Sequence, residues 1–94
     1  MSVYAMVHID VENAEEYAKY AALAGPAVVK YGGEFLARGG DCVQMEGKGR
    51  ARNVIIRFKD MATAKAFYHG PEYQEALAFG LPAATREYTF VEGV

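Results

Sequence analysis

The sequence has one cysteine, no long apolar run and no excess of either charge. Cys42 alone cannot form an internal disulfide, so the cysteine content does not indicate an oxidising compartment. The longest apolar stretch, residues 21–29, is far shorter than the roughly twenty residues that a membrane span requires. The N-terminal residues lack the basic start and apolar run of a signal peptide. Together these absences predict a cytoplasmic protein with no membrane association.

Charged and metal-binding residues are too dispersed to mark three common classes of site. The formal net charge is −2, and lysine and arginine form no stripe that would neutralise nucleic-acid phosphates. Two histidines and one cysteine without close spacing argue against a metal site. The glycine-rich segment 47–50 connects two strands rather than a strand and a helix, so it is not a phosphate-binding loop. We therefore expect no nucleic acid, no metal and no cofactor.

What the chain does contain is a high proportion of apolar and aromatic residues for its length. Hydrophobic residues make up 52% and aromatic residues 13% of 94 positions. A chain of this size buries only about two thirds of its surface and cannot divide its core, so residues 1–94 form a single domain. The apolar excess favours a second buried surface beyond that core.

The hydrophobic period alternates between the two-residue repeat of a strand and the 3.6-residue repeat of a helix. Asn13 and Asp60 are typical residues for capping helices, and Gly70 followed by Pro71 predicts a stop and restart within the second helix. Gly25 and Pro26 predict a kink or restart within the first helix. The predicted order is strand 3–10, helix 13–32, strand 33–46 broken at 39–41, turn 47–50, strand 53–59, helix 60–82 and strand 87–92.

This β-α-β-β-α-β order is that of the ferredoxin-like α+β fold. It predicts a four-stranded antiparallel sheet of order 4-1-3-2 with two helices on one face. The other sheet face is predicted to be partly apolar, because the strands predicted at 3–10, 53–59 and 87–92 carry apolar residues on both sides. An exposed apolar face of this size usually marks an interface. We therefore predict a homodimer in which two sheets meet face to face.

Five short segments resemble the family called domain of unknown function 1330. They are His8-Ile9-Asp10-Val11, Lys30-Tyr31-Gly32-Gly33, Leu36-Ala37-Arg38-Gly39-Gly40, Glu46-Gly47 and Gly70-Pro71-Glu72-Tyr73-Gln74. The resemblance covers essentially the whole chain, although Gly70 stands where the family often has serine. It implies the dimeric α/β barrel arrangement. That group includes cofactor-independent monooxygenases, muconolactone-isomerase-like enzymes and proteins with no known activity.

His8 and Arg38 are the candidate catalytic residues. An imidazole exchanges a proton near neutral pH, and an arginine beside a glycine-rich bend can hold a carboxylate or enolate oxygen in two hydrogen bonds. The structural alternatives are a histidine bonded to a neighbouring carbonyl or carboxylate, and an arginine paired with Asp41, Glu34 or Glu46. Simple alternation places Arg38 with Glu34 and Leu36. We predict that Arg38 reaches across one strand to share a pocket with His8.

Four tyrosines are candidate substrate-binding residues around a cavity between helices and sheet: Tyr17, Tyr20, Tyr31 and Tyr73. The alternative is core packing in which each hydroxyl reaches solvent. Two functions remain open. The first is a cofactor-independent, isomerase- or monooxygenase-like enzyme that acts on a small organic anion or phenolic ligand. The second is a non-catalytic homodimer that binds a metabolite or a protein.

Two glycines are predicted to have backbone angles that a β-carbon disfavours. Gly32 follows the first helix, where a left-handed residue commonly ends a helix, and Gly39 follows the strand that carries Arg38. Alanine at either position should therefore destabilise the protein.

Overall fold

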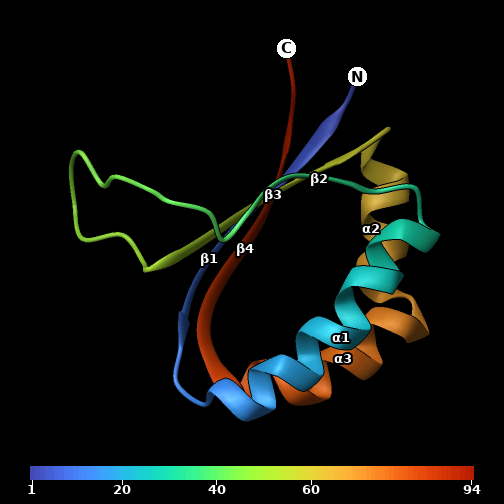
Figure 1. The fold of residues 1–94 in the computed structure, drawn as a ribbon. Helices are drawn as coiled ribbons and strands as arrows, with labels where there is room; N and C mark the ends of the chain where they lie inside the picture. The colour runs from blue at the N-terminus through green and yellow to red at the C-terminus, as the bar shows by residue number, and fades with distance from the viewer.

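The computed structural model describes residues 1–94 as one layer of sheet and one layer of helices. The elements in chain order are β1 (Val3–Val11), α1 (Ala14–Lys30), β2 (Glu34–Arg38), β3 (Arg52–Phe58), α2 (Met61–His69), α3 (Pro71–Ala83) and β4 (Ala84–Glu92). All three helices lie on one side of the sheet, and the two termini lie close together (Figure 1). None of these helices combines the length and apolar character needed to cross a bilayer.

The sheet has the strand order β2-β3-β1-β4, and every neighbouring pair is antiparallel. This is the predicted order read from the opposite edge, and it confirms the ferredoxin-like α+β fold. The predicted stop at Gly70 and restart at Pro71 are confirmed, because Gly70 adopts an extended conformation (φ −69°, ψ 157°) that separates α2 from α3, so the sheet carries three helices where two were predicted. Pro71 then begins α3 at a position where its missing N–H is not required.

The helix starts lie where the capping residues predict them. The Asn13 side chain accepts a hydrogen bond from the Glu16 amide at 3.1 Å, and the Asp60 side chain accepts one from the Thr63 amide at 2.8 Å. Each satisfies one of the amides that a helix start leaves without an intrahelical partner. The restart predicted near Gly25 is not observed, because α1 continues through Pro26 to Lys30.

The strand predicted over residues 33–46 is wrong beyond Arg38. Residues 39–51 contain no strand, and Gly39, Gly47 and Gly49 have φ values of 70°, 75° and 61°. Such left-handed residues interrupt the extended conformation that a strand needs. Residues 39–51 therefore form a long loop in place of the predicted four-residue turn, and this loop projects away from the helices (Figure 1).

The core lies between the helices and one face of the sheet, which we call the covered face. In β1 the alternate residues Val3, Ala5, Val7 and Ile9 are all at most 2% exposed. They pack with apolar residues of the neighbouring strands and with Phe67, Tyr73 and Leu77 of the helices. Strict alternation along β1 therefore decides which side chains face the helices.

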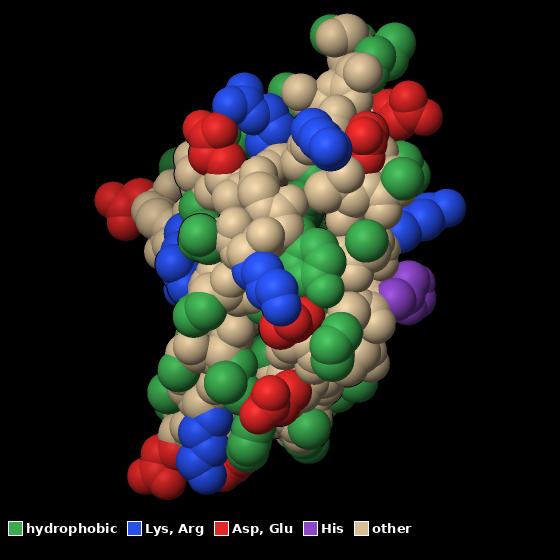
Figure 2. Space-filling view, turned by 90° about the vertical axis from the view of Figure 1, so that its right-hand side faces the viewer, with side chains coloured by type: hydrophobic (Ala, Val, Ile, Leu, Met, Phe, Trp, Pro, Cys, Tyr) green, Lys and Arg blue, Asp and Glu red, His purple; other side chains and the backbone are tan.

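The opposite face, which we call the open face, is covered by no helix. Apolar side chains on neighbouring strands lie side by side on this face: Met6 is paired with Ile55, and Tyr4 with Val91. Met6 is 39% exposed and Val91 is 44% exposed. On the helix side of the molecule, apolar, acidic and basic side chains are interspersed without a large area of one kind (Figure 2). The open face is thus the broad surface on which a second copy was predicted to pack.

Candidate functional site

A small cavity of about 40 Å³ lies between α1 and the covered face of the sheet. Tyrosines and aliphatic residues form most of its wall, and Arg38 and Arg52 are the charged residues among them. The lining residues are Val7, Ile9, Tyr17, Tyr20, Ala21, Ala24, Val28, Phe35, Arg38, Arg52, Val54, Ile56, Tyr73 and Tyr88. The cavity therefore combines an apolar interior with two fixed cations.

Strand register arranges the floor of this cavity in rows across the sheet. One row runs from Arg52 through Ile9 to Arg86. The next runs from Arg38 through Val54 and Val7 to Tyr88. Because neighbouring strands lie about 4.8 Å apart, Arg38 and Tyr88 begin about 14 Å from one another on opposite sides of the apolar floor.

A β-bulge at Leu36 turns Arg38 toward this cavity. Phe35 lies opposite Ile56 and Ala37 lies opposite Ile55, so Leu36 is an extra residue in β2. One extra residue reverses the alternation that follows it. Arg38 therefore joins Phe35 on the covered face, and its guanidinium carbon lies 4.1 Å from the centre of the Phe35 ring.

Gly39 makes room for the second arginine. A β-carbon at this position would lie 2.0 Å from Arg52 Nη1, and the φ of 70° is itself unfavourable for other residues. Arg52 Nε is buried and has no hydrogen-bond partner. The glycine after β2 thus permits Arg52 to place its guanidinium beside the cavity with donor capacity unused.

The β4 side of the cavity carries a cluster of phenol groups around Arg86. Tyr20 Oη and Tyr73 Oη lie 2.8 Å apart, and Arg86 Nη2 donates to them at 2.8 and 2.9 Å. Burial raises the pKa of Tyr73 to about 12 and also raises the pKa of Tyr20 and of Tyr88, so all three hydroxyls stay protonated near neutral pH. Tyr88 Oη is buried without a hydrogen-bond partner.

No carboxylate balances the positive charge around the cavity. Of the five arginines in the chain, Arg50 and Arg57 form ion pairs with acidic residues. The other three, Arg38, Arg52 and Arg86, form none, and no Asp or Glu lines the cavity. Arg38 is exposed, whereas Arg52 and Arg86 are partly buried, and a partly buried guanidinium without a counter-ion is costly, so this region favours binding of an anion.

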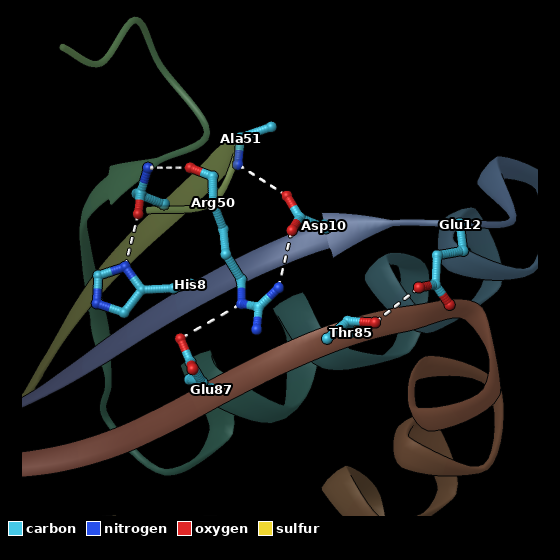
Figure 3. A network of polar contacts seen from close by, with 8 residues as sticks. His8, Asp10, Glu12, Arg50, Ala51, Thr85 and Glu87 are labelled. Atoms are coloured by element: carbon cyan, nitrogen blue, oxygen red, sulfur yellow. Dashed lines mark hydrogen bonds and ion pairs between the residues drawn. The ribbon is translucent and has the colours of Figure 1, made fainter. Parts of the chain in front are cut away.

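His8 lies on the open face, so the prediction that it shares a pocket with Arg38 was wrong. In β1 it alternates with Val7 and Ile9, which line the cavity, while the bulge has moved Arg38 to their side. His8 Nδ1 lies 2.6 Å from Asn53 Oδ1. Figure 3 shows His8 near the network in which Arg50 binds Asp10 and Glu87.

Of the four predicted tyrosines, the structure brings Tyr17, Tyr20 and Tyr73 together at the cavity. Tyr31 lies elsewhere, because it follows the end of α1 and its hydroxyl donates to Glu72 Oε1 at 2.9 Å. The same carboxylate binds Lys30, so Tyr31 helps to join α1 to the start of α3.

Sequence reasoning missed three residues of the site: Arg52, Arg86 and Tyr88. A signal was present in two strands. Arg52 is in phase with the buried Val54 and Ile56, and Arg86 is in phase with Tyr88. An arginine on the apolar phase of a strand must find a polar partner inside the fold or at its edge. No cluster of three or more His, Cys, Asp or Glu side chains is arranged to hold a metal ion.

Comparison with known proteins identifies relatives of the whole chain. The family model described as "Domain of unknown function (DUF1330)" matches residues 2–94. No curated protein is similar enough to match. The matches therefore identify a family without supplying an activity.

Several solved structures share the fold at low sequence identity. A protein of unknown function from Rhodopseudomonas palustris is 18% identical with a TM-score of 0.79, and the alignment covers 99% of this chain and 82% of that one. A dimeric ferredoxin-like protein of unknown function from Jannaschia sp. CCS1 is 16% identical with a TM-score of 0.78, over 99% and 100%. The cofactor-independent oxygenase SnoaB from Streptomyces nogalater is 10% identical with a TM-score of 0.67, over 99% and 93%. These likenesses show the fold alone.

Proposed function

Because the chain belongs to the DUF1330 family, whose description assigns no activity, we propose a function from the site itself: the protein binds a small organic anion in the cavity beneath α1. The observation that carries this proposal is the placement of the unpaired arginines. Arg38 and Arg52 border the cavity, Arg86 contacts two of its tyrosines, and none of the three has a carboxylate partner.

The shape and polarity of the cavity limit the ligand. Guanidinium groups at its β2 and β3 side suit a carboxylate, which accepts charge-assisted hydrogen bonds from arginine. The aliphatic floor suits a hydrocarbon segment. A cavity of about 40 Å³ has room for about three water molecules, so the part of the ligand that it encloses has three or four non-hydrogen atoms.

The functional unit that we propose is a homodimer. Related structures from Jannaschia sp. CCS1 and Bacteroides fragilis are described as dimeric. In this chain the open face offers Tyr4, Met6, Ile55 and Val91 on neighbouring strands and no helix covers it. Pairing of two open faces leaves the cavity of each protomer on the outer, helix-covered side.

The test of anion binding is a titration of the protein with pentanoate, followed by amide chemical shifts in NMR spectra. We expect saturable shifts around the cavity for pentanoate and none for its neutral amide. Arg52→Gln should weaken binding at least tenfold, which is about 1.4 kcal/mol and within the range for a hydrogen bond to a charged group.

Arg57→Gln is the matched control, since Arg57 is paired with Glu34 on the open face. Its affinity for pentanoate should stay within about twofold of the parent value. Equal affinities of Arg52→Gln and Arg57→Gln, or no binding of any carboxylate by the parent, would contradict the proposal.

A second candidate function is an enzyme that uses His8 on the open face. Asn53 Nδ2 donates to the Arg50 carbonyl at 3.2 Å, so its Oδ1 is the atom that faces His8 Nδ1. The imidazole then donates from Nδ1 and keeps Nε2 as a proton acceptor. If this function holds, His8→Gln abolishes turnover of a compound bound on the open face, while Arg52→Gln, on the covered face, leaves that turnover unchanged. Unchanged turnover in His8→Gln would exclude it.

A further inference from the structure

Buried hydrogen-bond donors near the cavity that have no partner indicate which second group the ligand carries besides its negative charge. Three buried side-chain atoms in the chain make no hydrogen bond: Arg52 Nε, Arg86 Nε and Tyr88 Oη. All three belong to the covered face, and two belong to residues that line the cavity. Buried donors are nearly always hydrogen-bonded, so a buried donor without a partner in the protein indicates where a ligand or water accepts a hydrogen bond.

The two lining residues stand on opposite sides of the cavity floor. Arg52 is on β3 and Tyr88 is on β4, with β1 between them and an offset of one row along the strands, so their backbones are about 12 Å apart. Val7 and Ile9 fill the floor between the two side chains. A ligand that satisfied both donors would therefore need two acceptor groups joined by a short apolar segment.

The two ends differ in the kind of acceptor that they suit. At the β3 side, Arg52 and Arg38 are cations that no carboxylate neutralises. At the β4 side, Arg86 does not line the cavity and its Nη2 is engaged with the Tyr20 and Tyr73 hydroxyls, so the lining residue with an unpartnered donor is Tyr88, which has one neutral O–H group. One O–H donor suits a carbonyl oxygen, whereas a carboxylate needs several donors or a free cation.

We propose that the ligand is a short oxo-carboxylate, with its carboxylate at Arg38 and Arg52 and its carbonyl oxygen accepting a hydrogen bond from Tyr88 Oη. This inference rests on the proposed anion-binding function and adds the second group. The enclosed volume of about 40 Å³ sets the spacing, because an enclosed part of three or four non-hydrogen atoms has room for two methylene groups and a carbonyl group behind a carboxylate at the mouth. The compound 4-oxopentanoate has this spacing and is the probe.

The experiment compares 4-oxopentanoate with pentanoate, which has the same chain length and no carbonyl. The parent protein should bind 4-oxopentanoate about tenfold more tightly, because a buried donor left without a partner penalises the analogue that lacks the acceptor. In Tyr88→Phe this preference should disappear, so that 4-oxopentanoate and pentanoate bind with about equal affinity. The measurement is an NMR titration or calorimetry of each acid with each variant.

Tyr68→Phe is the matched control, since the Tyr68 ring packs against the Tyr88 ring at 5.6 Å between centres and Tyr68 does not line the cavity. It should keep the tenfold preference. Equal binding of the two acids to the parent, with both dependent on Arg52, would overturn the oxo-carboxylate proposal and leave anion binding intact. Tighter binding of pentanedioate than of 4-oxopentanoate would also overturn it. Failure of all three acids to bind would overturn both proposals.

Discussion

The two faces of the sheet treat arginine in opposite ways. On the open face, Arg57 pairs with Glu34 and Arg50 from the adjoining loop pairs with Asp10 and Glu87. On the covered face, Arg38, Arg52 and Arg86 have phenol groups and aromatic rings around them but no carboxylate. We therefore assign a structural role to the arginines that carboxylates neutralise, and we propose that the arginines of the covered face, which no carboxylate neutralises, bind a ligand.

A single residue contributes to this difference between the faces. Without the bulge at Leu36, alternation would place Arg38 beside Glu34 on the open face, where Arg57 already lies. With the bulge, Arg38 joins Arg52 at the cavity and Glu34 remains available to Arg57. The bulge therefore separates a cation from the nearest carboxylate of its own strand.

The largest effect that we expect follows from a charge placed on the open face. Met6→Asp or Ile55→Asp would bury a carboxylate at the centre of a face-to-face dimer, so the mass measured by light scattering should fall from twice 10.3 kDa to 10.3 kDa. Val29→Asp is the control, since Val29 lies on α1 and is 68% exposed. A parent protein that is already monomeric would remove the open face from the comparison.

The next effect distinguishes Gly39 from Gly32, both of which have the predicted left-handed conformation (φ 70° and 76°). Alanine at either position should lower the free energy of unfolding by about 1 kcal/mol in urea denaturation. A β-carbon at Gly32 meets nothing within 4 Å, whereas one at Gly39 would meet Arg52. Only Gly39→Ala should also weaken pentanoate binding, by about tenfold if it displaces the guanidinium from the cavity.

Equal loss of affinity in Gly32→Ala and Gly39→Ala would show that general destabilisation, rather than displacement of Arg52, weakens binding. A Gly39→Ala variant with unchanged affinity would contradict the placement of Arg52 at the site.

A smaller effect concerns stability without ligand. Tyr88→Phe removes a buried hydroxyl that has no partner, so we expect the free energy of unfolding to rise by about 1 kcal/mol. Tyr73→Phe removes a hydroxyl that binds both Tyr20 and Arg86, so we expect a decrease of similar size. Urea denaturation of the two variants measures both changes. A decrease in Tyr88→Phe would mean that its hydroxyl is already satisfied in the unliganded protein.

Sequence patterns predicted the parts of the fold that depend on local chemistry. The alternation of Val3, Ala5, Val7 and Ile9 identified β1, and the caps at Asn13 and Asp60 located two helix starts. These features follow from neighbours within a few residues. Loop 39–51 was harder to predict, because Val43 and Met45 resemble strand residues although they are 81% and 84% exposed.

The candidate site was predictable only in part, since its assembly depends on contacts between distant residues. Tyr17 and Tyr20 share one face of α1 by helical spacing and lie at the cavity. Arg38 was identified by its residue type, but its face depends on a bulge at Leu36 that no glycine or proline marks. Tyr31 was placed wrongly because its partner, Glu72, is 41 positions away in the sequence.

The smallest effect tests the open face by pH. The Asp10 carboxylate accepts hydrogen bonds from the Ala51 amide at 3.0 Å and from Arg50 at 2.8 Å, and these contacts lower its pKa below the usual 3.8. A depressed carboxyl pKa stabilises the folded state above the unfolded pKa, and this stabilisation is lost as pH falls through the folded value. Asp10→Asn should therefore unfold slightly below the parent temperature at pH 7, and the difference should shrink below about pH 3.8.

Two comparisons make this small shift interpretable. Glu46 lies in loop 39–51, which Asp10 contacts, but it forms no ion pair. Glu46→Gln should therefore show no pH-dependent difference in unfolding temperature from the parent protein. Because arginine stays protonated throughout this range, acid should release the connection between Asp10 and loop 39–51 without discharging Arg38 or Arg52. Hydrogen exchange at pH 3 should then rise at the Ala51 amide before it rises in β1. Simultaneous loss of protection in both would mean that the loop connection and the sheet unfold as one unit.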